Sequence, residues 1–76
     1  MTLFAYIGQN LDRIRFDVRC GIIPCAILKH YRVYSRYDYY KRLNNNTSDA
    51  VIYTCNDYRV SQRWVFTIIK KMEAEL

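Results

Sequence analysis

The sequence predicts an all-α fold, a small bundle of about four helices. Three observations support this prediction. Only two glycines and one proline occur in 76 residues, which favours long helices over a turn-rich β fold. Apolar residues recur mainly at three- and four-residue steps, the spacing of one helix face. About half of the residues (51%) are hydrophobic, so a chain near the lower size limit of a self-supporting core can fold without metal or disulfides.

The first 20 residues carry two overlapping signals. One is the seam of an amphipathic helix, with apolar residues at Phe4, Ile7, Leu11, Ile14 and Val18. The other is a strict alternation of charged and apolar residues from Arg13 to Cys20, as in a half-buried strand. The helical register is longer and no strand partner follows, so helix is favoured, although residues 2–20 stay open between the two. Gly8 then marks a start or break, and Asn10 can cap a helix that runs through Arg19.

A helix stop and a helix start follow at residues 21–24. Gly21 suits the left-handed residue after a helix, and Pro24 suits the first turn of the next helix. From Pro24 the chain reaches Leu43 without a breaker. Two shifted apolar stripes run along this segment, first Ile27, Tyr31 and Tyr34, and then Val33, Tyr37 and Tyr40. The segment is therefore one helix buried on more than one side, or two helices that divide near Ser35.

Tyrosines interleave with basic residues in this segment. The tyrosines are Tyr31, Tyr34, Tyr37, Tyr39 and Tyr40, and the basic residues are Lys29, Arg32, Arg36, Lys41 and Arg42. Three interpretations stay open. The rings can stack on the bases of a single-stranded nucleic acid while the basic residues contact phosphates. They can instead pack in the core beneath a solvated basic face, or they can form a dimer interface, where Tyr and Arg are enriched.

The polar run Asn44–Ser48 divides the chain, which we expect to form a single domain over residues 1–76. Asn tolerates left-handed conformations and Thr or Ser caps helices, so this run is a connector. We expect residues 1–43 to form a helical support and residues 48–73 to form a two-helix unit.

The C-terminal unit has the pattern of two short helices joined by a tight turn. The first helix is expected to be capped by Thr47, Ser48 or Asp49 and to line its inner side with Val51, Ile52, Cys55 and Tyr58. Ser61 is a good cap for the second helix, because its hydroxyl can accept an unpaired backbone N–H of the first turn. The apolar residues of that helix fall on one face, at Val65, Ile68, Ile69 and Met72. The tail, Glu73–Leu76, is expected to fray.

This unit resembles the helix-turn-helix of DNA-binding repressors, recombinases and transposases. The matching features are a small residue in the first helix, an apolar residue after the turn, a helix-starting serine and two inward apolar residues, namely Cys55, Val60, Ser61, Val65 and Ile68. The family usually has glycine at the position of Arg59, because the turn needs a positive φ that costs other residues roughly 1–2 kcal/mol. A longer turn would accommodate Arg59.

The resemblance implies a duplex-binding surface on the second helix, whose N-terminal residues would meet base edges in the major groove. The side opposite the apolar face carries Gln62, Arg63, Phe66, Thr67 and Lys70. Gln62 can pair with adenine and Arg63 with guanine, each worth about 1–3 kcal/mol of discrimination, and Phe66 can touch a thymine methyl. The residues suited to phosphates are Arg59, Ser61, Thr67, Lys70 and Lys71. Trp64, at the flank, is expected to bridge to the N-terminal helices.

Composition favours an anionic partner and argues against catalysis. Twelve Lys and Arg against seven Asp and Glu give a net charge of +5, which suits a polyanion. His30 is the only histidine and stands in no nucleophile motif, and no glycine-rich phosphate loop occurs, so we expect no enzyme and no cofactor. The spacing of Cys20, Cys25 and His30 is too wide for paired zinc ligands, so no metal is expected. With Cys55, the cysteines are interpreted as reduced, buried or partly buried thiols.

The predicted function is duplex DNA binding, sequence-reading or non-specific, in transcription regulation or in a mobile element. Double-stranded DNA is the expected partner. One such unit reads only a few base pairs, so the chain is expected to act as a homodimer or alongside a partner. No apolar run approaches the ~20 residues of a membrane span and no signal-like pattern begins the chain, so we expect a cytoplasmic protein without membrane contact. The alternative function is a small helical protein–protein interaction or assembly module with a tyrosine-rich interface.

Overall fold

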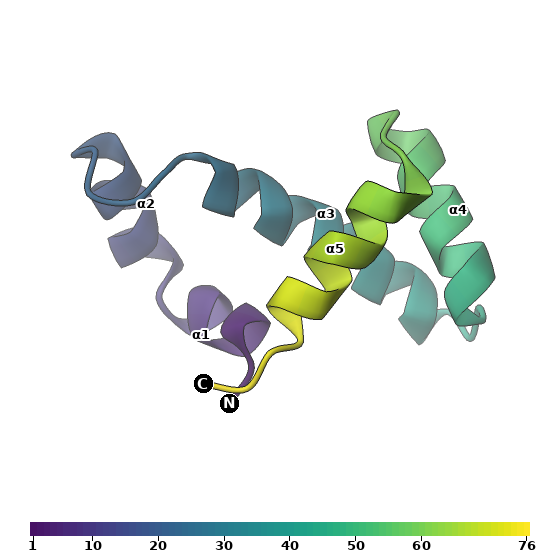
Figure 1. Cartoon of the computed structure of the whole chain (residues 1–76). Helices are drawn as coiled ribbons and strands as arrows, with labels where there is room; N and C mark the ends of the chain where they lie inside the picture. Colours follow the sequence, from purple (N-terminus) through teal and green to yellow (C-terminus); the bar gives the residue numbers. More distant parts are fainter.

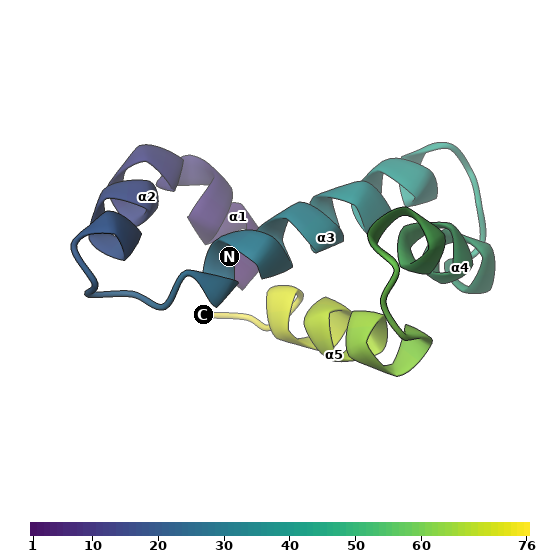
Figure 2. The same ribbon diagram turned by 90° about the horizontal axis from the view of Figure 1, so that it is seen from above.

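Five α-helices make up the computed structural model, which describes residues 1–76. They are α1 (Leu3–Gln9), α2 (Leu11–Arg19), α3 (Ala26–Arg42), α4 (Thr47–Tyr58) and α5 (Gln62–Met72). The all-α prediction is confirmed, and α1 and α2 make the first 20 residues helix rather than strand. The bundle has five helices where about four were expected, because the N-terminal segment divides into α1 and α2. α3 runs through the middle of the molecule, with α4 at its C-terminal end, α5 packed across it, and α1 and α2 toward its N-terminal end (Figures 1 and 2).

The break between α1 and α2 falls at Asn10. Gly8 instead lies inside α1, where an added Cβ would stand 3.4 Å from the hydroxyl oxygen of Tyr31. Asn10 makes no capping bond to α2, because its side-chain amide donates to the carbonyl oxygen of Tyr6 at 2.8 Å. The predicted apolar seam nevertheless faces the core in both helices, since Ile7 and Ile14 are buried and the seam residues Phe4, Leu11 and Val18 pack partly buried against them.

α3 is one unbroken helix of 17 residues that is buried on more than one side. Ser35 does not divide it, because the Ser35 hydroxyl donates back to the carbonyl oxygen of Tyr31 at 2.8 Å within the helix. Both predicted stripes reach the core, with Val33, Tyr34 and Tyr37 buried and Ile27, Tyr31 and Tyr40 partly buried. Gly21 has a φ of 79° between α2 and α3, which confirms the predicted left-handed stop.

The entry and the inner side of α4 differ from the prediction. Asn46, rather than Thr47, Ser48 or Asp49, caps the helix: it has the extended conformation that a cap needs, and its side-chain oxygen accepts the backbone N–H of Asp49 at 2.8 Å. Val51 and Cys55 are buried as expected. Ile52 is 41% exposed, because the buried face of α4 is centred on Ala50, Val51, Thr54 and Cys55. The buried Thr54 hydroxyl is satisfied by donating to the carbonyl oxygen of Ala50 at 2.8 Å.

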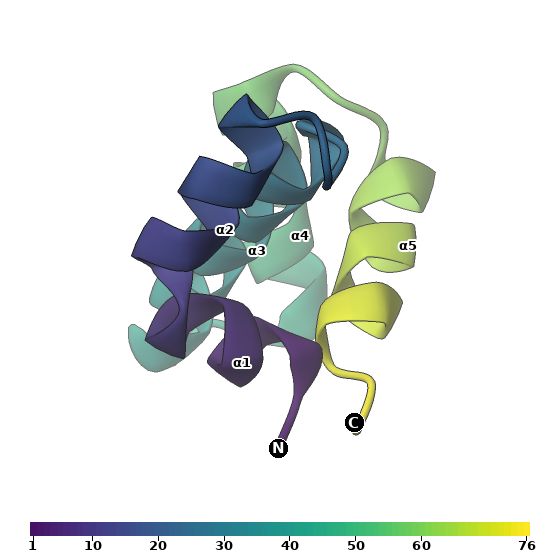
Figure 3. The same ribbon diagram turned by 90° about the vertical axis from the view of Figure 1, so that its left-hand side faces the viewer.

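The C-terminal tail is paired rather than frayed. Residues Thr2 and Glu75 form an antiparallel bridge, and the Leu3 N–H donates to the carbonyl oxygen of Ala74 at 3.0 Å. The two ends of the chain therefore lie side by side (Figures 1 and 3). The Tyr34 hydroxyl also donates to the Glu73 carboxylate at 2.9 Å. Burial and this hydrogen bond raise the pKa of Tyr34 above its ordinary value. None of the five helices combines the length and the apolar content needed to cross a membrane.

Candidate nucleic-acid interface

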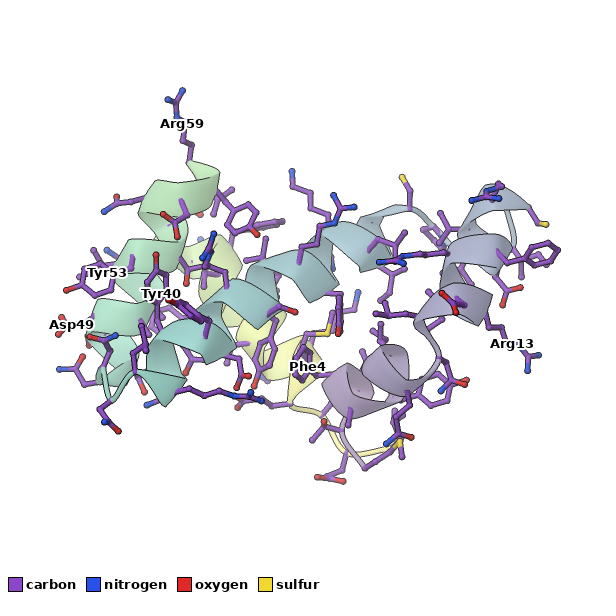
Figure 4. All side chains as sticks on the ribbon, turned by 180° about the vertical axis from the view of Figure 1, so that it is seen from behind. Phe4, Arg13, Tyr40, Asp49, Tyr53 and Arg59 are labelled. Atoms are coloured by element: carbon purple, nitrogen blue, oxygen red, sulfur yellow. The ribbon has the colours of Figure 1, made fainter.

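The turn between α4 and α5 has only three residues, Arg59, Val60 and Ser61. Arg59 adopts the left-handed conformation, with φ 54° and ψ 49°, which a tight turn at this position was expected to need. The backbone N–H groups of Arg59 and Val60 both donate to the carbonyl oxygen of Cys55, the second at 3.2 Å, which closes the end of α4. The chain therefore accepts the left-handed residue, at a cost of roughly 1–2 kcal/mol, instead of lengthening the turn. The Arg59 side chain extends away from the molecule at the end of α4 (Figure 4).

α5 is anchored along one face and capped at its start. The Ser61 hydroxyl oxygen accepts the backbone N–H of Trp64 at 3.1 Å, which confirms the predicted cap. The inner face carries Val65, Ile68 and Met72, none of which is more than 2% exposed. Burial of these three side chains fixes the rotation of the helix, so its opposite face is held toward solvent.

All of the residues predicted to contact DNA are exposed, namely Arg59, Ser61, Gln62, Arg63, Phe66, Thr67, Lys70 and Lys71. Four of them, Arg63, Phe66, Thr67 and Lys70, recur at three- and four-residue steps and form the outer stripe of α5. The Thr67 hydroxyl donates to the carbonyl oxygen of Arg63 at 3.0 Å, which leaves its oxygen as an acceptor. Gln62 and Lys71 lie on opposite flanks of this stripe.

Trp64 packs against the first half of α3, as the expected bridge to the N-terminal part of the chain. The ring centroids of Trp64 and His30 are 5.6 Å apart in an edge-on arrangement, and Lys29 Nζ lies 5.4 Å from the Trp64 ring. Lys71 Nζ lies 3.4 Å from His30 Nδ1. Burial, and then the charges of Lys71 and Lys29, lower the pKa of His30 below 6.5. When the ring is neutral, His30 Nδ1 can accept a hydrogen bond from the Lys71 ammonium group.

Lys29 and His30 were not predicted to lie beside the α5 surface. His30 and Lys71 are 41 residues apart, and no local spacing relates them. The sequence contains only a weak indication of this contact: Lys29 and His30 are adjacent on a helix that has apolar residues on two sides.

The charge on this side of the molecule is almost purely positive. No acidic residue occurs between Asp57 and Glu73, a range that contains all of α5, or between Asp17 and Asp38, a range that contains the first half of α3. The three ion pairs of the molecule join Met1 to Glu75, Arg36 to Asp57, and Arg42 to Asp38. The cationic groups of α5 are thus not neutralised within the chain, which raises the local attraction for anions.

The cysteines differ in part from the expectation of burial. Cys55 is buried in α4, and burial raises the pKa of its thiol. Cys20 and Cys25 are exposed, because they lie in the connection between α2 and α3, outside the core. No three His, Cys, Asp or Glu side chains come together in a group that could hold a metal ion.

No protein-family model, characterised protein or solved structure matches this chain. The functional interpretation therefore depends on the chemistry and placement of its own residues.

Proposed function

We propose that the chain binds duplex DNA through the outer face of α5. One observation carries the proposal: α5 is held by three buried aliphatic side chains while it presents Arg63, Thr67 and Lys70 on one exposed stripe, with no carboxylate in the helix. Guanidinium, ammonium and hydroxyl groups are the donors that contact phosphates and base edges. An α-helix also fits the major groove, which is about 12 Å wide.

The proposed docking places the start of α5 against the bases. Gln62 and Arg63 are the first two residues of the helix and would read base edges, with Phe66 one turn further on against a thymine methyl. Arg59 and Ser61 in the turn, with Lys70 and Lys71 along the helix, would contact phosphates on either side. Thr67 would join them by turning its hydroxyl hydrogen from the Arg63 carbonyl oxygen to a phosphate. The left-handed Arg59 and the Ser61 cap support this likeness to a helix-turn-helix, because both belong to the tight-turn pattern.

We further propose that the chain acts in transcription regulation or in a mobile element, in the cytoplasm, as a homodimer or beside a second DNA-binding protein. A single recognition helix reads few base pairs, so a second copy would supply the rest of the site. The alternative, an assembly module with a tyrosine-rich interface, has less support. Of the clustered tyrosines, Tyr34 and Tyr37 are buried and Tyr31 and Tyr40 are partly buried, which leaves only Tyr39 mostly exposed.

The test is a salt titration of binding to a fluorescently labelled duplex of random sequence. The logarithm of the affinity should fall linearly with the logarithm of the salt concentration, with a slope of about −0.9 for each phosphate contacted. Arg63→Ala and Lys70→Ala should each weaken binding. Lys70→Ala should also reduce the magnitude of the salt slope by about 0.9, the contribution of one phosphate contact.

The matched control is Arg13→Ala, which removes the same charge from α2. Arg13 is exposed and points outward on the opposite side of the molecule from Arg59 (Figure 4). Circular dichroism should show the same helical content for all three variants, because the three side chains are exposed. An affinity loss for Arg63→Ala no larger than that for Arg13→Ala would exclude α5 as the binding helix.

A further inference from the structure

Cationic and aromatic side chains meet where α3 packs beside α5. Lys29 Nζ lies over the Trp64 ring at 5.4 Å, and the His30 and Trp64 rings meet in an edge-on arrangement. Lys71 Nζ closes this group from α5, at 3.4 Å from His30 Nδ1. A partly exposed indole with a cation on its face can stack on a base while the cation approaches a phosphate.

The next turns of α3 continue this pattern around an open depression of about 350 Å³, lined by Arg32, Ser35, Arg36, Tyr39 and Tyr58. The Arg36 guanidinium lies 5.7 Å from the centroid of the Tyr39 ring. The Tyr58 hydroxyl donates to the carbonyl oxygen of Arg32 at 3.3 Å, which fixes that ring at the wall of the depression. The volume is at the lower end of the range for small-ligand clefts, about 300–1,000 Å³, and so suits one planar group at a time.

These side chains form a continuous row, the α3 strip, made of Lys29, Arg32, Arg36 and Tyr39 with Trp64 and Tyr58 beside them. The α3 residues follow one another at steps of three, four and three, so they share one face of the helix. The row extends over about 15 Å at the helical rise of 1.5 Å per residue. Its Lys29 end lies beside Trp64 of α5, and its Arg32 and Arg36 end lies against Asp57 and Tyr58 of α4. The row is distinct from the outer stripe of Arg63, Phe66, Thr67 and Lys70.

The charges of the α3 strip are mostly free of internal partners. Its single ion pair joins Arg36 Nε to Asp57 Oδ2 at 3.4 Å, and the same carboxylate oxygen accepts a hydrogen bond from Tyr40 at 2.5 Å. Lys29 and Arg32 take part in none of the ion pairs of the molecule. The strip therefore offers net positive charge together with the exposed Tyr39 ring and the partly exposed rings of Tyr58 and Trp64.

We propose that the α3 strip binds single-stranded nucleic acid. A duplex presents phosphates but keeps its bases stacked inside, so it would use the cations of the strip and leave the rings without a ligand. A single strand presents both phosphates and base faces, which matches alternating cations and aromatic rings. The proposal is independent of duplex binding by α5, because it uses a different row of side chains.

The experiment measures two ligands in parallel, labelled oligo(dT) of about 12 nucleotides, within the footprint range of small single-strand-binding domains, and a random-sequence duplex. Trp64 is the only tryptophan of the chain and lies in the strip, so oligo(dT) should quench its fluorescence. Tyr39→Ala should weaken oligo(dT) binding about tenfold through lost base stacking. Arg32→Ala should weaken it several-fold and reduce the salt slope by about 0.7. Neither variant should change duplex affinity by as much as Arg63→Ala does.

Tyr6→Ala is the matched control for the ring, since Tyr6 is 44% exposed on α1 and outside the strip, while Tyr39 is 50% exposed. Arg13→Ala is the control for the charge. The proposal is overturned if the wild-type chain does not bind oligo(dT), or if Tyr39→Ala binds it as tightly as Tyr6→Ala does. The proposal would also be overturned if Tyr39→Ala and Arg32→Ala lost equal affinity for oligo(dT) and for the duplex. That result would mean that the strip is part of the duplex-binding surface. Failure of duplex binding alone, with Tyr39→Ala and Arg32→Ala still selective for oligo(dT), would remove the proposed role of α5 and retain the α3 strip.

Discussion

α2 and α5 have similar surfaces but are held very differently. Each helix carries several basic side chains and one exposed phenylalanine, Phe16 at 59% in α2 and Phe66 at 48% in α5. α5 buries Val65, Ile68 and Met72, whereas α2 buries only Ile14. α5 packs against α1, α3 and α4, while α2 lies at the edge of the molecule beside α1 (Figures 1 and 3). The basic face of α5 is therefore held in place by more buried side chains than the basic face of α2.

The charges of the two helices differ as well. Asp12 and Asp17 stand among the arginines of α2, so phosphates that approach α2 also meet carboxylates. α5 has no acidic residue, and its neighbour Lys29 on α3 adds to its positive charge. A basic exposed helix is common in small proteins. Firm anchoring and unopposed charge are what distinguish α5 as the candidate interface.

The largest expected effect is on the free energy of unfolding, because α5 buries more apolar side chains than α2. Ile68→Ala should lower the free energy of unfolding by about 2–5 kcal/mol, because Ile68 is 2% exposed and its removal leaves a cavity among three helices. Leu11→Ala in α2 should cost less than half as much, since Leu11 is only partly buried. Urea denaturation monitored by Trp64 fluorescence and by circular dichroism gives both values. Similar losses in the two variants would mean that α2 is held as firmly as α5.

The N-terminal caps of α5 and α2 should also differ in their contribution to stability, by a smaller amount. Ser61→Ala should lower the free energy of unfolding by about 1 kcal/mol, because the Ser61 hydroxyl oxygen accepts the Trp64 N–H. Asn10→Ala at the start of α2 should cost less, because Asn10 makes no capping bond there and its bond to Tyr6 is exposed. Thermal unfolding of both variants compares the caps. A larger loss for Asn10→Ala would show that the α1–α2 junction, and not the α4–α5 turn, needs its polar side chain.

Sequence periodicity predicted the features that depend on neighbouring residues. The Ser61 cap, the left-handed Gly21 and the inward Val65, Ile68 and Met72 are local, because each follows from backbone geometry within one or two turns. The same geometry made all eight candidate DNA contacts exposed. Several neighbouring candidates competed for the cap of α4, and Asn46 was missed because Thr, Ser and Asp cap helices about as well.

Features that depend on distant residues were not predictable. The tail is ordered by Thr2 and Leu3, at the other end of the chain, and the Lys71–His30 contact joins two helices. The role of the tyrosines depended on which sides of α3 are covered by α1, α4 and α5. Once these helices are placed, Tyr34 and Tyr37 are in the core while Tyr39 is exposed, a division that helical spacing alone left open.

The smallest expected effect is a pH dependence of DNA binding. It tests the positive charge beside α5 through the titration of His30, the only histidine of the chain. Burial and the charges of Lys71 and Lys29 lower its pKa below 6.5 in the free protein. The unfolded chain therefore binds the proton more readily, so the contribution of His30 to stability is complete above pH 6.5 and declines as the pH falls below that value. A polyanion on α5 would offset the lysine charges and raise the pKa of His30.

Binding of duplex DNA should consequently take up a proton and strengthen as the pH falls through the interval between the two pKa values. The gain in DNA affinity is at most tenfold for each unit by which bound DNA raises the pKa of His30. An NMR titration of the His30 ring with and without saturating duplex at low salt measures both values, and His30→Gln should abolish the pH dependence of binding. Arg13→Ala should leave the pKa of His30 unchanged, because α2 lies apart from His30. Lys71→Ala should raise the pKa of His30 in the free protein. A His30 pKa that is the same in free and DNA-bound protein would place the DNA away from the Lys71 flank of α5.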